Sequence, residues 1–388
     1  MSRVLEVFSA FLRLGLSSFG GPTAHIGYFR DEFVARRRWL DEPEFADLIA
    51  LCQFLPGPAS SQLGFAIGLM RAGFPGALAA WIGFTAPSAV ALIAFAYEAD
   101  ALSGSVGAGV LHGLKLVAVA VVANAVWGMA RTLCPDLIRA AIAVLGAALI
   151  LSNIMPYGQI AVILAGAIAG YFLCRSGAPI AATLSAALVS RRTGSAALAA
   201  FFLLLGALPV AHGITGSSGI ALFDAFYRSG ALVFGGGHVV LPLLRDAIVV
   251  PGWVGEDDFL AGYGAAQAMP GPLFAFAAYL GMKTDLSLGG AALGLVAIFL
   301  PGFLILVGVL PFWDGFRRLA SAQAAMRGVG AAVVGLLGAT LYSPVWTSGV
   351  RSAGDIVMVL SGFALLTIWR IPPLIVVILG IVAGLVLA

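Results

Sequence analysis

Two arginines, Arg13 and Arg228, lie inside otherwise apolar stretches of the sequence. A charged side chain at the centre of a bilayer costs about 2.5–3.5 kcal/mol even on the mildest insertion scale, so it is rarely placed there without a function. No acid lies within one helical turn of Arg13, whereas Asp224 lies four residues before Arg228. A guanidinium presents a fork of donors that fits a tetrahedral oxyanion, so the pair indicates an anionic substrate. The alternative is that both side chains reach a membrane interface or pair with Asp31 and Asp246.

A Phe-Gly-Gly sequence follows each arginine and ends in Gly20-Gly21 or in Gly235-Gly236. Consecutive exposed backbone N–H groups bind anions, but small residues also let membrane helices pack closely. The chain has 50 glycines, and most of them are expected to serve packing. The doubled, matched pairs favour an anion site.

A Pro-Gly-Pro sequence interrupts each of two further apolar segments. Proline lacks the backbone donor and clashes with the preceding turn, so a helix must break there. In a bilayer, broken backbone is tolerated only where protein or a water-filled cavity covers it. Two matched breaks are typical of transporters with a central site, where they act as hinges; a kink that serves only packing is the alternative. The breaks consist of Pro56, Gly57 and Pro58, and of Pro270, Gly271 and Pro272.

Several polar side chains accompany these motifs. Gln53 and Gln267 stand three residues before the two breaks, where an amide either donates to an oxyanion or joins two helices. Four titratable groups are candidates for proton coupling, although a lone histidine more often has a structural role. They are His25, His238, Asp47 and Asp224.

These motifs recur because the chain contains one unit twice. The two arginines are 215 residues apart (228 − 13), and the two glutamines are 214 apart (267 − 53). Order, spacing and residue type are kept over about 75 residues, which chance explains poorly. We expect an N-terminal repeat at 1–175, a linker region with one span at 176–212, and a C-terminal repeat at 213–388.

The composition places these repeats in a membrane. Hydrophobic residues make up 61% of the 388 residues and charged residues only 10%, which excludes an ordinary soluble protein. The predicted fold class is an all-α polytopic membrane protein with about 12–13 hydrophobic segments. Six segments in each half and one between them predict inverted halves, unless the Pro-Gly-Pro segments are re-entrant. The stretch 176–190 is either a linker or an interfacial helix, and membrane orientation stays open.

Other classes of function find no support in the sequence. The net charge is only +3 and no basic run resembles a nucleic-acid tail, so we expect no nucleic-acid partner. The three cysteines lack metal-binding spacing, and no cofactor is expected. The absence of a Walker motif and of a nucleophile–base spacing argues against ATP drive and against an enzyme. Without a signal-peptide pattern, the chain is expected to insert through its own spans, most simply into a cytoplasmic membrane.

Together, these motifs resemble those of the chromate ion transporter family in its long-chain, two-repeat form. The resemblance covers nearly the whole chain. A small departure between the copies is that Thr85 stands where the second copy has Phe299. In the first copy the resemblance rests on "FGGPTAHI" and "RRRWLDEPEFADLIALCQFLPGP", and in the second on "FGGGHVVLPLL" and "GWVGEDDFLAGYGAAQAMPGP".

The resemblance implies proton-driven export of chromate, which confers chromate resistance, with sulfate as a look-alike anion. The residues themselves indicate only an anion transporter, so a sulfate or other oxyanion transporter, a passive anion channel and an intramembrane enzyme remain alternatives. Oligomeric state is open, a homodimer included. The expected substrate ligands are Arg13, Gly20, Gly21, Gln53, Gly57, Arg228, Gly235, Gly236, Gln267 and Gly271.

Overall fold

The computed structural model describes residues 2–101, 104–152, 158–175, 189–234, 236–316 and 319–387. Within these ranges every regular element is a helix and no strand occurs, which confirms the all-α class. The first half contains α1 (Arg3–Ser17), α2 (Gly21–Phe29), α3 (Glu42–Phe54), α4 (Ala59–Ala101), α5 (Gly104–Leu133), α6 (Leu137–Leu151) and α7 (Gly158–Leu173). After α8 (Arg191–Thr215), the second half contains α9 (Ser218–Ala231), α10 (Val240–Leu244), α11 (Glu256–Ala268), α12 (Phe276–Met282), α13 (Ser287–Val309), α14 (Trp313–Phe316), α15 (Ala320–Thr340), α16 (Thr347–Gly349), α17 (Ala353–Thr367) and α18 (Pro373–Leu387).

The order of the helices repeats. Counterparts are α1 and α9, α3 and α11, α5 and α15, α6 and α17, and α7 and α18, with α8 between the halves. Even the surface contacts recur, because Arg30 pairs with Glu42 (Nη2–Oε1 2.5 Å) as Arg245 pairs with Glu256 (Nε–Oε2 3.1 Å). The predicted two-repeat organisation is therefore present in three dimensions.

The first helix of each half ends before its apolar stretch does. Helix α1 stops at Ser17 and α9 at Ala231, before the Phe-Gly-Gly sequences. Gly20 has φ +101°, Gly21 +76° and Gly236 +153°, conformations that side-chain-bearing residues rarely adopt. Each first segment is thus a helix followed by a break, which hydropathy alone does not detect.

Helix α4 also changes direction. Ala72 and Gly73 have non-helical dihedral angles, and the backbones of Gly68 and Gly76 touch each other. Because residues eight apart lie about 12 Å apart in a continuous helix, this contact requires the two parts of α4 to fold back on each other. The first part, 59–71, is too short at about 20 Å to cross a bilayer alone.

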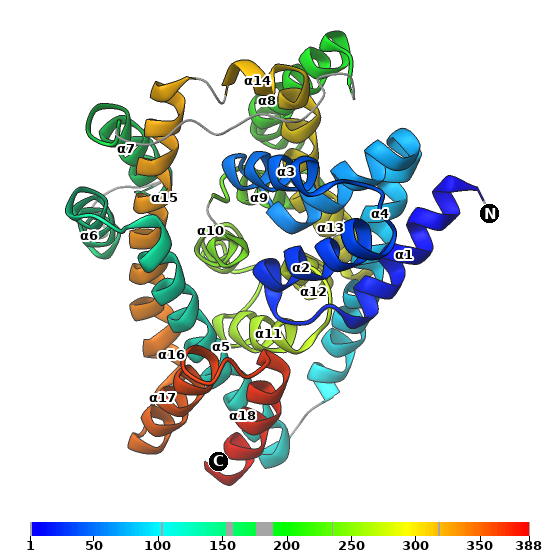
Figure 1. The fold of residues 1–388 in the computed structure, drawn as a ribbon. Helices are drawn as coiled ribbons and strands as arrows, with labels where there is room; N and C mark the ends of the chain where they lie inside the picture. The colour runs from blue at the N-terminus through cyan, green and yellow to red at the C-terminus, as the bar shows by residue number, and fades with distance from the viewer. Residues whose placement is uncertain are drawn as a thin grey trace.

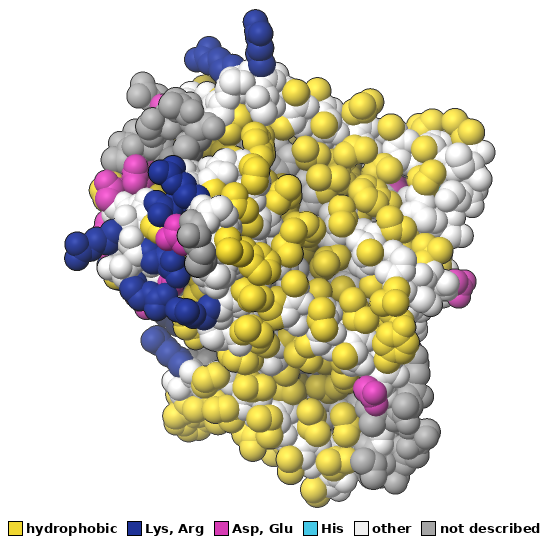
Figure 2. All heavy atoms as spheres, turned by 90° about the vertical axis from the view of Figure 1, so that its right-hand side faces the viewer, with side chains coloured by type: hydrophobic (Ala, Val, Ile, Leu, Met, Phe, Trp, Pro, Cys, Tyr) yellow, Lys and Arg dark blue, Asp and Glu magenta, His cyan; other side chains and the backbone are white. Residues whose placement is uncertain are grey.

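Within the part of the chain that the structure describes, five stretches of helix are long and apolar enough to cross a membrane, and one of them is the folded-back α4. The same residues contain five shorter apolar helices of 10 to 17 residues. Figure 2 shows a broad hydrophobic face beside an edge where arginine and lysine side chains gather. The five long stretches are Ala59–Glu98, Gly107–Leu133, Arg191–Thr215, Ser287–Gly315 and Ala320–Gly349. Most of the expected stretch 176–190 lies outside the described residues.

The last two helices of each repeat pack on the other repeat. Helices α6 and α7 lie against α15, and α17 and α18 lie against α5 (Figure 1). Glycines permit the close approach in both places, since Gly113 of α5 meets Gly380 and Gly328 of α15 meets Gly166. Each repeat therefore completes the other, and neither half is an independent packing unit.

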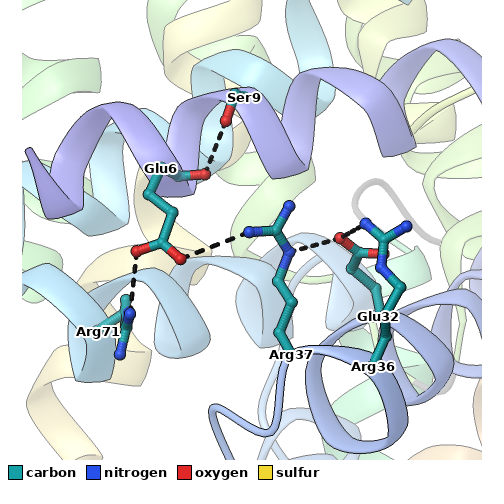
Figure 3. Close-up of polar contacts among 6 residues, drawn as sticks. All are labelled: Glu6, Ser9, Glu32, Arg36, Arg37 and Arg71. Atoms are coloured by element: carbon teal, nitrogen blue, oxygen red, sulfur yellow. Dashed lines mark hydrogen bonds and ion pairs between the residues drawn. The ribbon is translucent and has the colours of Figure 1, made fainter. Parts of the chain in front are cut away.

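A network of charges ties three segments of the first repeat together (Figure 3). Glu6 of α1 accepts from Arg71 (2.9 Å) and pairs with Arg37 (3.5 Å). Arg37 and Arg36 also donate to Glu32, over 2.6 and 2.5 Å. Burial acts to raise the pKa of Glu32, but these hydrogen bonds outweigh it and hold the pKa below its usual value. The network fixes the π-helical segment after α2, Arg30–Arg36, to α1 and to the turn within α4.

Candidate functional site

The two Pro-Gly-Pro breaks meet the two Phe-Gly-Gly breaks across the boundary between the repeats. The N–H of Gly57 donates to the carbonyl of Val233 (2.7 Å), and the N–H of Gly271 donates to the carbonyl of Ser18 (2.9 Å). Gly57 corresponds to Gly271, and Ser18 corresponds to Val233. The two hydrogen bonds are therefore equivalent and reciprocal. We call these places the Val233 crossing and the Ser18 crossing.

Glycine is required at both crossings for two reasons. Gly57 has φ +121° and Gly271 has φ +101°, so any side chain would strain the backbone. A Cβ atom on Gly57 would lie 2.9 Å from Cα of Gly302, and one on Gly271 would lie 3.0 Å from Oγ of Ser88. Each break therefore sits directly against a helix of the other repeat, α13 or the second part of α4.

The flanking prolines explain why the helices stop. Helix α3 ends one residue before Leu55, and α11 ends one residue before Met269, which confirms that the helices break at the Pro-Gly-Pro sequences. Whether these breaks flex as hinges stays a prediction. The residues concerned are Pro56, Pro58, Pro270 and Pro272.

His25 is buried at the Ser18 crossing. Its Nε2 lies 3.3 Å from the carbonyl oxygen of Ser18, and its Nδ1 lies 3.3 Å from Oγ of Ser60. The ring also packs edge-on against Phe84, with centroids 5.1 Å apart. The Ser18 carbonyl is therefore in contact with both the Gly271 amide and a titratable ring.

Gln62 holds the Val233 crossing together. Its Nε2 donates to the carbonyl oxygens of Pro56 and Gly302, both over 2.9 Å. One side chain thus joins the break of the first repeat to α13 of the second. Sequence reasoning missed Gln62, Ser18, Ser60 and Ser88, because each differs in type from its counterpart in the second repeat and so gives no repeated motif.

The two predicted arginines differ in their surroundings. Arg13 is exposed on α1, away from the face that packs on α4, and it has no ion pair within the described part of the chain. Arg228 donates to Asp224 (Nε–Oδ1 2.7 Å) and to the carbonyl of Leu205 in α8 (3.1 Å). Arg13 is thus exposed, as the interface alternative expects, and Arg228 has internal partners; their joint role as anion ligands stays a prediction.

The two glutamines also differ. Gln53 is exposed, whereas the Nε2 atom of Gln267 is buried and has no partner among the described residues. Gly20 and Gly21 lie in the break beside Ser18, and Gly236 lies in the matching break. Gly235 falls outside the described residues. Of the expected ligands, Gly20, Gly21, Gly57, Gly236, Gln267 and Gly271 thus lie at or next to the two crossings.

The other three candidates for proton coupling each have different hydrogen-bond partners. Nδ1 of His238 lies 2.6 Å from the hydroxyl of Tyr263. Asp47 is buried in α3, and its Oδ1 accepts from Nε1 of Trp313 over 3.3 Å. His25, by contrast, contacts a residue of a crossing hydrogen bond. Within the described ranges, no cluster of three histidine, cysteine or acidic side chains could hold a metal ion.

Comparison with known proteins agrees with this architecture. The family model described as "Chromate transporter" matches the chain twice, at residues 5–171 and 220–385. The chain is 28% identical to the chromate transport protein of Pseudomonas aeruginosa, over 86% of this chain and 79% of that protein. It is 26% identical to the probable chromate transport protein of Synechococcus elongatus, over 97% and 93% of the two chains. No solved structure matches the chain. The chain, a multi-pass membrane protein built from two repeats, belongs to the chromate transporter family.

Proposed function

We propose that the protein is a secondary active transporter that exports chromate across the bacterial cytoplasmic membrane, driven by the proton motive force, and thereby confers chromate resistance. The observation that carries the proposal is the reciprocal pair of hydrogen bonds from Gly57 to Val233 and from Gly271 to Ser18. Membership of the family supports chromate as the transported anion.

The crossings suit alternating access. Each Pro-Gly-Pro break belongs to one repeat but is held by the backbone of the other. A small rotation of one repeat against the other would therefore alter both crossings together, closing one side while opening the other. Inverted halves, which stay a prediction, would place the two crossings on opposite sides of one central site.

Proton coupling is proposed to act through His25. A histidine ring can carry a proton, and this one lies 3.3 Å from the carbonyl that also receives the Gly271 amide. A change in its charge would thus alter the contact between the repeats. The other candidates for proton coupling are Asp47, Asp224 and His238. Their hydrogen-bond partners include Trp313, Arg228 and Tyr263, respectively.

The test is uptake of labelled chromate into vesicles that contain the purified protein, with an imposed pH gradient and sulfate as competitor. We expect chromate to accumulate against its own gradient and the accumulation to collapse with a protonophore. Movement of sulfate but not chromate would assign a different oxyanion. Flux that follows only the anion gradient would indicate a passive channel. Movement of neither anion would contradict transport and favour an intramembrane enzyme.

A further inference from the structure

The two crossings match in backbone geometry but differ in chemistry. Around the Ser18 crossing, five buried first-repeat side chains are polar. Their second-repeat counterparts carry no polar side-chain atoms, and among them the rings of Phe274 and Phe299 lie 5.7 Å apart. The polar set is Ser18, His25, Ser60, Thr85 and Ser88, and the counterparts are Val233, Val240, Phe274, Phe299 and Gly302.

Three polar groups near the Ser18 crossing have no hydrogen-bond partner among the described residues. They are the hydroxyls of Ser18 and Thr85 and the Nε2 amide of Gln267. Ser18 is 0% exposed and Thr85 is 2% exposed. A buried polar group without a partner costs about 1–3 kcal/mol, so proteins retain few of them without a function.

Contacts among the described residues bring the elements that carry these groups to one place. Gly271 donates to the Ser18 carbonyl, and its α-carbon faces the carbonyl of Phe84 and the hydroxyl of Ser88. Ser88 in turn donates to the carbonyl of Thr85 over 3.0 Å. Gln267 lies one helical turn before Gly271, at the end of α11. The three unpartnered groups therefore come from three elements that converge on one hydrogen bond.

We propose that Ser18, Thr85 and Gln267 form the binding site for a tetrahedral oxyanion and hold it through neutral donors. The proposal rests on the proposed function, and it assigns the substrate ligands within that site. Each group can donate one hydrogen bond to an anionic oxygen, and such charge-assisted bonds are stronger than neutral ones. Fixed neutral donors in a site without bulk water stabilise an anion because they need no reorganisation when it arrives.

The chemistry at the Val233 crossing supports this choice. Oε1 of Gln62 is an unpartnered acceptor there, while Nε2 of the same amide donates to two carbonyls. An acceptor repels an anionic oxygen, whereas hydroxyl and N–H groups donate to it. The anion is therefore expected at the Ser18 crossing, and the Val233 crossing serves as its apolar counterpart.

The experiment measures thermal unfolding of the purified full chain in detergent at increasing concentrations of sodium sulfate and of sodium chromate. The variants are Ser18→Ala and Thr85→Val, each of which removes a hydroxyl and little volume. The matched controls are Ser17→Ala, next in sequence but exposed, and Thr340→Val, buried but with its hydroxyl bonded to the carbonyl of Leu336 in its own helix.

We expect the wild-type protein to gain stability as anion is added, since a ligand that binds only the folded state raises its melting temperature. Ser18→Ala and Thr85→Val should melt no lower than wild type without anion, yet need about tenfold more anion for the same shift. The controls should need as much anion as wild type.

Three results would overturn the inference. They are an unchanged anion requirement in both variants, a lower melting temperature of both variants without anion, and no anion-dependent shift in the wild-type protein. If wild-type vesicles still accumulate chromate in any of these cases, the proposed function stands and only the site fails. If the anion shift is present and lost in the variants while vesicles move no chromate, the site stands and the proposed function fails.

Discussion

At the scale of single residues, the carbonyl of Ser18 is the point at which the two repeats and a titratable side chain meet. It accepts the Gly271 amide and lies 3.3 Å from Nε2 of His25. A backbone oxygen cannot be recognised from sequence as an acceptor, because every residue has one. Sequence reasoning instead pointed to Arg13 and Arg228, where charge in an apolar segment is conspicuous. The sequence shows that a buried charge would be unfavourable there. It does not show that Arg228 donates hydrogen bonds to Asp224 and to a carbonyl of α8.

The role of His25 can be separated from that of the anion ligands. Replacement His25→Gln keeps a donor and an acceptor near Ser18 and Ser60 but removes the group that takes up a proton. We expect vesicles with this variant to pass chromate down its gradient and to lose accumulation driven by a pH gradient. His212→Gln, at an exposed position in α8, is the control and should accumulate chromate normally. Full pH-driven accumulation by His25→Gln would exclude this residue as the coupling group.

At the scale of elements, the breaks were predictable and the contacts between helices were not. Proline at Pro56 and Pro270 forbids continuous helix for a local reason, so the sequence pattern suffices. The packing of α6 and α7 on α15, and of α17 and α18 on α5, joins segments far apart in the sequence. The glycines that permit it are visible in the sequence, but among 50 glycines no local pattern shows which partner each one meets.

This packing makes a prediction on one helix, α5. A Cβ on Gly113 would collide with the carbonyl oxygen of Gly380, whereas one on Gly128 meets no atom within 4 Å. Gly113→Ala should therefore lower stability by about 1–3 kcal/mol through overpacking. Gly128→Ala should be neutral or stabilise the helix by up to about 1 kcal/mol. Thermal unfolding in detergent checks both, and equal melting temperatures for the two variants would contradict the packing of α18 on α5.

At the scale of the whole molecule, the internal repeat predicted the architecture best. Matching residues of the two copies are 214 to 215 positions apart, from the arginines through the Pro-Gly-Pro sequences. The order of the helices follows the same repeat. The repeat could not predict that equivalent crossings differ in chemistry, because the argument selected residues that are the same in both copies. The chemical difference between the crossings lies in positions such as Thr85 and Phe299, where the copies differ.

The central claim is that both crossings are needed for transport. Its most direct test is the rate of pH-driven chromate accumulation per folded protein in vesicles, for Gly57→Ala and Gly271→Ala measured separately. Either substitution places a side chain on a backbone at positive φ and against the opposite repeat, so we predict that each variant loses most of its transport. Gly206→Ala in α8, where a Cβ meets nothing within 4 Å, should transport normally. Wild-type accumulation by either crossing variant would contradict the account.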